Sequence, residues 1–120
     1  MTSKYLSDKQ CFVIITALRK YINQCNLKAS DIDLIVKETS ILESLRLFFA
    51  LEQDNIFRTQ IKLEATWITL NLAMGSVQTI EMICSEEFRL FQSIDKQLDQ
   101  SSEEIMLHSV WFMGNILGES

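Results

Sequence analysis

The strongest constraint on the fold is a repeat, because the end of the chain copies a pattern found in its middle. At a spacing of 44 residues, Trp67 and Asn71 correspond to Trp111 and Asn115, and the apolar positions around them match as well. Residues four apart lie one turn apart on a helix, so each Trp-x-x-x-Asn pair occupies one helical face. The sequence therefore predicts two equivalent helices, each carrying the same aromatic and polar pair.

The rest of the chain also has a helical period. Apolar residues recur every three or four positions, which is typical of amphipathic helices. The 120 residues include no proline and three glycines, fewer than a turn-rich chain needs. The predicted helices span about 8–24, 30–37, 40–50, 58–74, 76–84, 86–97 and 102–117, and Leu18 and Phe88 are among the residues expected to point inward.

The ends of these helices carry recognisable signals. Ser7 or Asp8 is expected to cap the first helix, and Ser30 and Ser76 are expected to cap the two short helices that follow them. Gly75 is predicted to end the helix over 58–74 in a left-handed conformation.

The helices follow the order short, short, long, which then recurs. Three-helix units with a period in the low forties are typical of armadillo repeats, in which each unit stacks on its neighbours. We therefore predict an all-α fold, an armadillo-type right-handed superhelical solenoid of about two and a third three-helix repeats. The chain is interpreted as one domain over 1–120, with a partial first unit at 1–28 and repeats at 29–75 and 76–120. The apolar face between Leu98 and Leu117 has no further unit to cover it and is a candidate for self-association.

Charge and composition exclude several functions. The net charge is −5, and residues 61–120 hold three basic and nine acidic side chains, which is unfavourable for nucleic acid and suits a basic partner or a solvated face. No segment is apolar enough to cross a membrane, and the start of the chain lacks the apolar core of a signal peptide. Cys11, Cys25 and Cys84 are expected to be free thiols, because their number and spacing fit neither a disulfide framework nor a zinc site.

The sequence shows no pattern of residues that is typical of an enzyme. The single histidine, His108, has no nucleophile or second metal ligand at a suitable spacing, and no glycine-rich loop precedes a helix. We expect neither catalysis nor a cofactor nor a bound metal.

Two segments resemble the importin-α family of armadillo adaptors, which recognise nuclear localisation signals. They are residues 63–79, LEATWITLNLAMGSVQT, and residues 110–120, VWFMGNILGES. The resemblance implies a peptide-binding adaptor for nuclear import, present in the cytoplasm and nucleus, with a Lys/Arg-rich cargo segment and other transport factors as partners. It also implies a surface for that segment and a pocket for its key lysine. The binding residues implied in this way are Trp67, Asn71, Gly75, Thr79, His108, Trp111, Asn115 and Glu119.

A second interpretation stays open at this point. Tryptophan at helical spacing is often part of a core, and helical asparagine often bonds its own backbone. The chain also departs from the family, since Glu119 stands where the family has aspartate and the loop from Gly75 to Thr79 is one residue shorter. The alternative is an armadillo scaffold for protein–protein interaction or self-association, without cargo binding.

Overall fold

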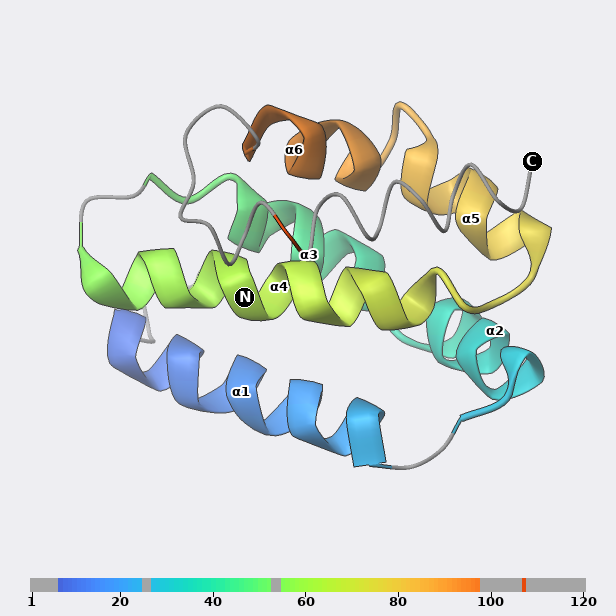
Figure 1. Ribbon diagram of the computed structural model, residues 1–120, viewed down its shortest axis with the longest axis horizontal. Coiled ribbons are helices and arrows are strands. Elements are labelled where there is room, and N and C mark those ends of the chain that lie inside the picture. The colour runs from blue at the N-terminus through green and yellow to red at the C-terminus, as the bar shows by residue number, and fades with distance from the viewer. Residues whose placement is uncertain (1–6, 25–26, 53–54, 98–106, 108–120) are drawn as a thin grey trace.

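The computed structural model is helical throughout the part of the chain that it describes, residues 7–24, 27–52, 55–97 and 107 (Figure 1). No β-strand occurs within these ranges. The helices follow one another in the order α1 (Asp8–Gln24), α2 (Ala29–Glu38), α3 (Ile41–Phe49), α4 (Ile56–Leu72), α5 (Val77–Cys84) and α6 (Leu90–Gln97). The prediction of an all-α chain with short, short, long segments is confirmed over these residues.

The two long helices, α1 and α4, lie side by side and have the same length of 17 residues (Figure 1). α4 also contacts α3 and α5, and α3 contacts α6. Helices that hold the same place in the short, short, long order thus meet one another: α1 meets α4, and α3 meets α6. This arrangement makes α4 the centre of the described structure.

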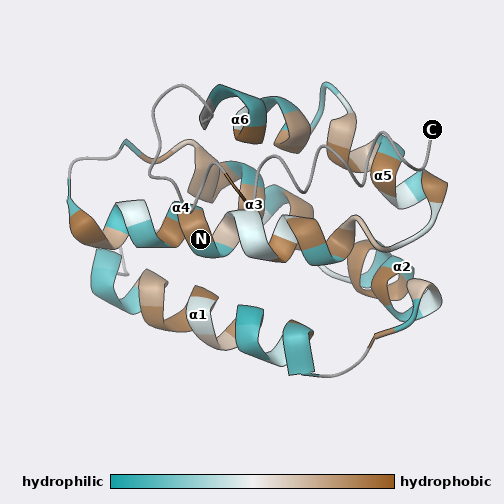
Figure 2. Ribbon diagram, viewed as in Figure 1, coloured by the Kyte–Doolittle hydropathy of each residue, from teal (hydrophilic) through white to brown (hydrophobic). Residues whose placement is uncertain are grey.

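The core forms between the apolar faces of these helices (Figure 2). Ile15 of α1, Leu45 of α3, Ile68 of α4, Ile83 of α5 and Ile94 of α6 are fully buried. Leu18 is an exception to the predicted pattern, because its side chain is exposed on the outer side of α1. The three-and-four spacing cannot separate it from the inward residues, since the apolar face of α1 is wider than the strip that α4 covers.

Several predicted helix starts are confirmed and one is corrected. The Ser7 and Ser76 hydroxyls accept hydrogen bonds from the backbone N–H groups of Gln10 and Thr79. Ser30 does not cap α2, which begins one residue earlier at Ala29. There the Asp31 carboxylate accepts the Lys28 backbone N–H over 2.9 Å, so an acidic side chain in the first turn closes the helix start.

The helix predicted over 86–97 is shorter in the structure. Arg89 has a φ of 53°, in the left-handed region, and residues 86–88 form a turn. α6 therefore begins at Leu90, and Phe88 packs against the core from the turn rather than from the helix. The backbone conformation of one residue breaks the helix here, and the spacing of apolar residues does not reveal such a conformation.

Gly75 was predicted to adopt a left-handed conformation, and this is wrong, because no glycine in the described ranges has a positive φ. α4 ends earlier, at Leu72. Glycine is required for space instead: a Cβ at Gly75 would lie 2.9 Å from the Asp33 carboxylate and 2.9 Å from the Ile32 side chain. The chain leaving α4 therefore passes directly against α2.

Candidate functional site

The predicted aromatic and polar pair lies on α4 beside α1. Trp67 is half-buried and packs against the core, and Asn71 is half-buried one turn later. The Asn71 side-chain amide donates to the backbone carbonyl of Trp67 over 2.9 Å and to Asn23 Oδ1 over 2.7 Å. The two residues share one face of α4, as the spacing predicts, and Asn71 connects that face to α1.

Asn23 is a member of this site that the sequence analysis missed. It lies inside α1, in the last turn, and 48 residues separate it from Asn71. The starts and ends of α1 and α4 are also 48 residues apart. Asn23 therefore holds in α1 the position that Asn71 holds in α4, and the two amides form one rung between equivalent places. The available signal was this third asparagine at the end of a long helix.

The same register places Arg19 where α4 has Trp67. The Arg19 guanidinium donates to the Glu64 carboxylate of α4, with an Nε–Oε2 distance of 2.5 Å. Only 10% of the Glu64 side chain is exposed, so the pair is largely removed from water. The Glu64 carboxylate raises the pKa of Arg19 above its ordinary value. The α1–α4 seam is thus held by a salt bridge at one level and by the asparagine rung one turn further along.

Two residues predicted to hold a lysine, Gly75 and Thr79, lie beside a carboxylate that the prediction did not include. Thr79 is buried, and its hydroxyl donates to Asp33 Oδ1 of α2 over 2.6 Å. The Ser76 backbone N–H donates to the same oxygen over 3.0 Å. The loop that contains Gly75 is therefore organised around the Asp33 carboxylate, which the sequence analysis did not select.

The Asp33 carboxylate is stabilised in its charged form. The hydrogen bonds from the Thr79 hydroxyl and then from the Ser76 backbone N–H lower its pKa below the ordinary value of 3.8. It remains partly exposed. A half-exposed, ionised carboxylate beside a threonine hydroxyl is a suitable end point for an ammonium group.

The remaining predicted binding residues, which are His108, Trp111, Asn115 and Glu119, lie outside the described residues. Of the eight, the structure thus places Trp67, Asn71, Gly75 and Thr79. It brings them into two neighbouring groups, one along α4 and one at the α4–α5 loop.

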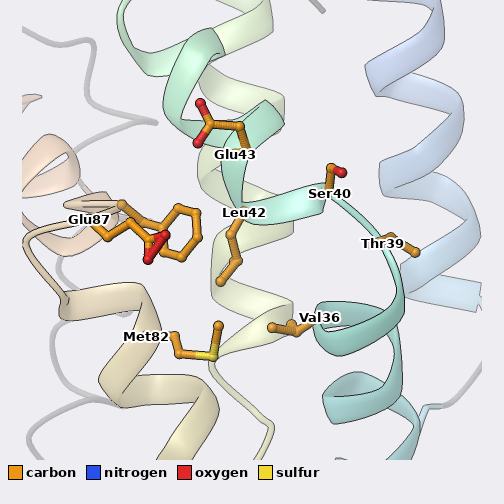
Figure 3. A pocket seen from close by; sticks show the side chains of 8 residues that line it. Val36, Thr39, Ser40, Leu42, Glu43, Met82 and Glu87 are labelled. Carbon is orange, nitrogen blue, oxygen red and sulfur yellow. The ribbon is translucent and has the colours of Figure 1, made fainter.

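A cavity of about 250 Å³ lies away from these residues, between the α2–α3 junction and the α5–α6 junction (Figure 3). Val36, Leu42 and Met82 give it an apolar interior, and Glu43 and Glu87 stand at its edges. The Glu43 carboxylate already binds Arg46. The cavity contains no nucleophile paired with a base.

The same described part of the chain lacks two further features. None of its helices combines the length and the apolar character needed to cross a bilayer. Its cysteine, aspartate and glutamate side chains form no group of three able to hold a metal ion. The free thiols of Cys11 and Cys84 have a raised pKa because burial disfavours the thiolate.

The helix order and the paired long helices define an all-helical protein compatible with repeat-type stacking. A search of curated proteins matches this chain to importin subunit alpha-6 of Arabidopsis thaliana, with 36% identity over 63 residues. The match covers 52% of this chain and 11% of that relative, so the chain spans a small part of its length. No family model and no solved structure matches. The partial match supports armadillo-like repeats and a repeat-type protein-binding role, without assigning the chain to a family.

Proposed function

We propose that this protein is an armadillo-like adaptor that holds a Lys/Arg-rich segment in extended form along the face of the long helices α1 and α4, as importin-α proteins hold nuclear localisation signals. Nuclear import, with the protein in the cytoplasm and nucleus, is the process this role would serve. The observation that carries the proposal is the rung between Asn71 and Asn23 beside half-buried Trp67. Asparagine amides at a fixed spacing suit an extended peptide, because each offers a donor and an acceptor to a peptide backbone.

Each part of this surface has a separate task in the proposal. The Asn71 oxygen accepts a peptide N–H, and the amide exchanges its bond to Asn23 for a peptide carbonyl. The Trp67 ring supports the methylene stem of a basic side chain. No enzyme activity, cofactor or metal enters this mechanism.

The key lysine is assigned to the pocket at the α4–α5 loop. Its ammonium would bind the Asp33 carboxylate next to Thr79, at the loop that contains Gly75. Asp33 is already ionised and held by two hydrogen bonds, so little reorganisation is needed when the cation arrives. This modifies the set that the resemblance implies, since it adds an acid from α2 to the pocket.

A second candidate function also has a specific observation in its favour. Trp67 packs against the core, as a purely structural tryptophan does. The alternative is therefore an armadillo scaffold that binds other proteins or itself without an extended basic cargo. The two functions differ in whether basic peptide reaches the face that carries Trp67 and Asn71.

Tryptophan fluorescence during titration with a Lys-Lys-x-Lys peptide tests the proposal, with the all-alanine peptide as the ligand control. We expect a saturable change with the lysine peptide alone, weakened by salt because the contact is ionic. Asn71→Ala combined with Asn23→Ala should abolish it. Asp33→Asn should weaken it about tenfold, since it removes the charge and keeps the shape.

The matched control is Gln24→Ala, which removes an exposed amide next to Asn23. This variant should bind like the parent protein. Equal responses to both peptides, or an unchanged response in the Asn71 and Asn23 double variant, would reject the basic-cargo function. The scaffold interpretation would then remain.

A further inference from the structure

The outer side of α1 carries an apolar stripe that no described helix covers. Val13, Ile14, Ala17, Leu18 and Tyr21 are all exposed, and 58% of Val13 and 61% of Tyr21 is accessible to solvent. Their spacing of three and four residues aligns them on one face. Figure 2 shows this apolar middle of α1 between hydrophilic ends. We call these five residues the α1 stripe.

The residues of α4 that correspond to the α1 stripe show how this face is covered when other helices lie beside it. At the spacing of 48 residues, Val13, Ala17 and Tyr21 correspond to Ile61, Ala65 and Thr69 of α4. These three residues are completely buried. Around the helix, Ile61 lies about a sixth of a turn from Glu64, the α4 residue that bonds α1, and Ala65 and Thr69 lie about a quarter turn or more from it. α4 also packs on α3 and α5.

The α1 stripe is thus the face that in α4 is completely buried within the same structure. The main contact of α1 among the described helices is with α4 alone. The described neighbours of α4 are all helices, namely α1, α3 and α5, so an amphipathic helix laid on the α1 stripe would give α1 the same kind of cover. The geometry therefore specifies a helix as the occupant, rather than an extended segment.

Charge at the edge of the stripe specifies the occupant further. Lys9 and Lys20 are exposed along the same row of α1 as Val13, and neither makes an ion pair with a described residue. The other two charged residues of α1, Asp8 and Arg19, are already bound to Arg58 and Glu64 of α4. α1 therefore offers two unpaired cations on a protein whose net charge is −5.

We propose that the α1 stripe is a docking site for an amphipathic helix of a partner protein, with an apolar face and carboxylates along one edge. Its apolar face covers Val13, Leu18 and Tyr21, and its acidic edge pairs with Lys9 and Lys20. A second copy of α1 fits poorly, because it brings no unpaired carboxylate to these lysines. This site is separate from the proposed basic-cargo surface and accepts the opposite charge.

Two synthetic helical peptides of about 18 residues test the proposal, a length at which isolated helices begin to persist. Both carry leucine at i, i+3, i+4 and i+7, and they differ only in having glutamate or lysine along the edges of that face. Fluorescence anisotropy of the labelled peptides measures binding to the whole protein. We expect saturable binding of the glutamate peptide. The affinity of the lysine peptide should be at least about tenfold lower.

Two sets of variants separate the apolar and the charged contributions. Val13→Ser with Leu18→Ser should remove binding of both peptides, and Lys9→Glu with Lys20→Glu should reverse the preference between them. Leu34→Ser and Lys37→Glu are the matched controls, since both residues are exposed on α2. The controls should leave both affinities unchanged, and circular dichroism of every variant confirms that it is folded.

Three results overturn the proposal. The first is no saturable binding of the glutamate peptide, and the second is equal binding of the two peptides. The third is self-association in sedimentation equilibrium that Val13→Ser with Leu18→Ser abolishes, since the occupant would then be a second copy. None of these results bears on the basic-cargo surface, which the Lys-Lys-x-Lys titration tests separately.

Discussion

The two long helices, α1 and α4, have equal length and matching register but very different surroundings. α4 contacts α1, α3 and α5, and its residues Ile61, Ala65 and Thr69 are completely buried. The corresponding residues of α1 are exposed. The spacing of apolar residues thus shows which faces of a helix could be buried. Which of these faces are buried depends on the neighbouring helices.

The exits of the two helices differ in the same way. After α4, the loop at Gly75 is bound to another helix through Asp33. At the equivalent place after α1, the Lys28 backbone N–H binds Asp31 of its own helix start. A loop held between helices contributes to stacking, whereas a local cap contributes only to one helix.

The largest effect is expected at the matched pair of Ile61 and Val13. Ile61→Ala leaves a cavity at a fully buried position, and we expect it to lower the free energy of unfolding by about 3 kcal/mol. Val13→Ala removes exposed methyl groups and should change it by less than about 0.5 kcal/mol. Urea unfolding followed by circular dichroism measures both. Equal losses would show that the two helices are covered alike and would contradict the comparison.

The next effect concerns one of the ion pairs that join the two helices. Glu64→Leu leaves the Arg19 guanidinium without its partner in a largely buried position, and we expect a loss of about 2 kcal/mol. Adding Arg19→Met should restore most of this loss, because an apolar pair needs no compensating charge. The control is Glu86→Gln, in the exposed pair with Arg89, which should have no measurable effect. Additive losses from Glu64→Leu and Arg19→Met would show that the two residues do not interact.

A smaller effect is expected at the exit of α4. Gly75→Ala places a Cβ 2.9 Å from Asp33 and from Ile32, so one of them must move, and we expect a loss of about 1–2 kcal/mol. In an Asp33→Ala background the same change should cost less, since one of the two close contacts is gone. Lys28→Ala, at the matching exit of α1, is the control and should have little effect. Identical losses in the free energy of unfolding in both backgrounds would show that the steric conflict is not with Asp33.

Local and non-local features were not equally accessible from the sequence. The six described helices follow from spacing, and Ser7 and Ser76 follow from their chemistry as caps, because both signals lie within a few residues. Asp33 could not be selected in this way, since its partners Ser76 and Thr79 are more than 40 residues away. Asn23 was missed because its role appears only when α1 is placed beside α4. The sequence therefore identified one residue of each contact, and its partner is known only from the way the helices pack.

The smallest effect is a dependence of the stability on pH that comes from Asp33. The pKa of folded Asp33 lies below the ordinary 3.8, so its charged form stabilises the fold. This contribution is complete above the pKa of the unfolded chain and is lost as the pH falls through the lower, folded value. We expect Asp33→Asn to be less stable than the parent at neutral pH and to approach it as the pH falls through the folded pKa of Asp33. Urea midpoints measured between about pH 7 and pH 2.5 test this, and a difference from the parent that stays constant over this range would show that the charge of Asp33 does not stabilise the fold.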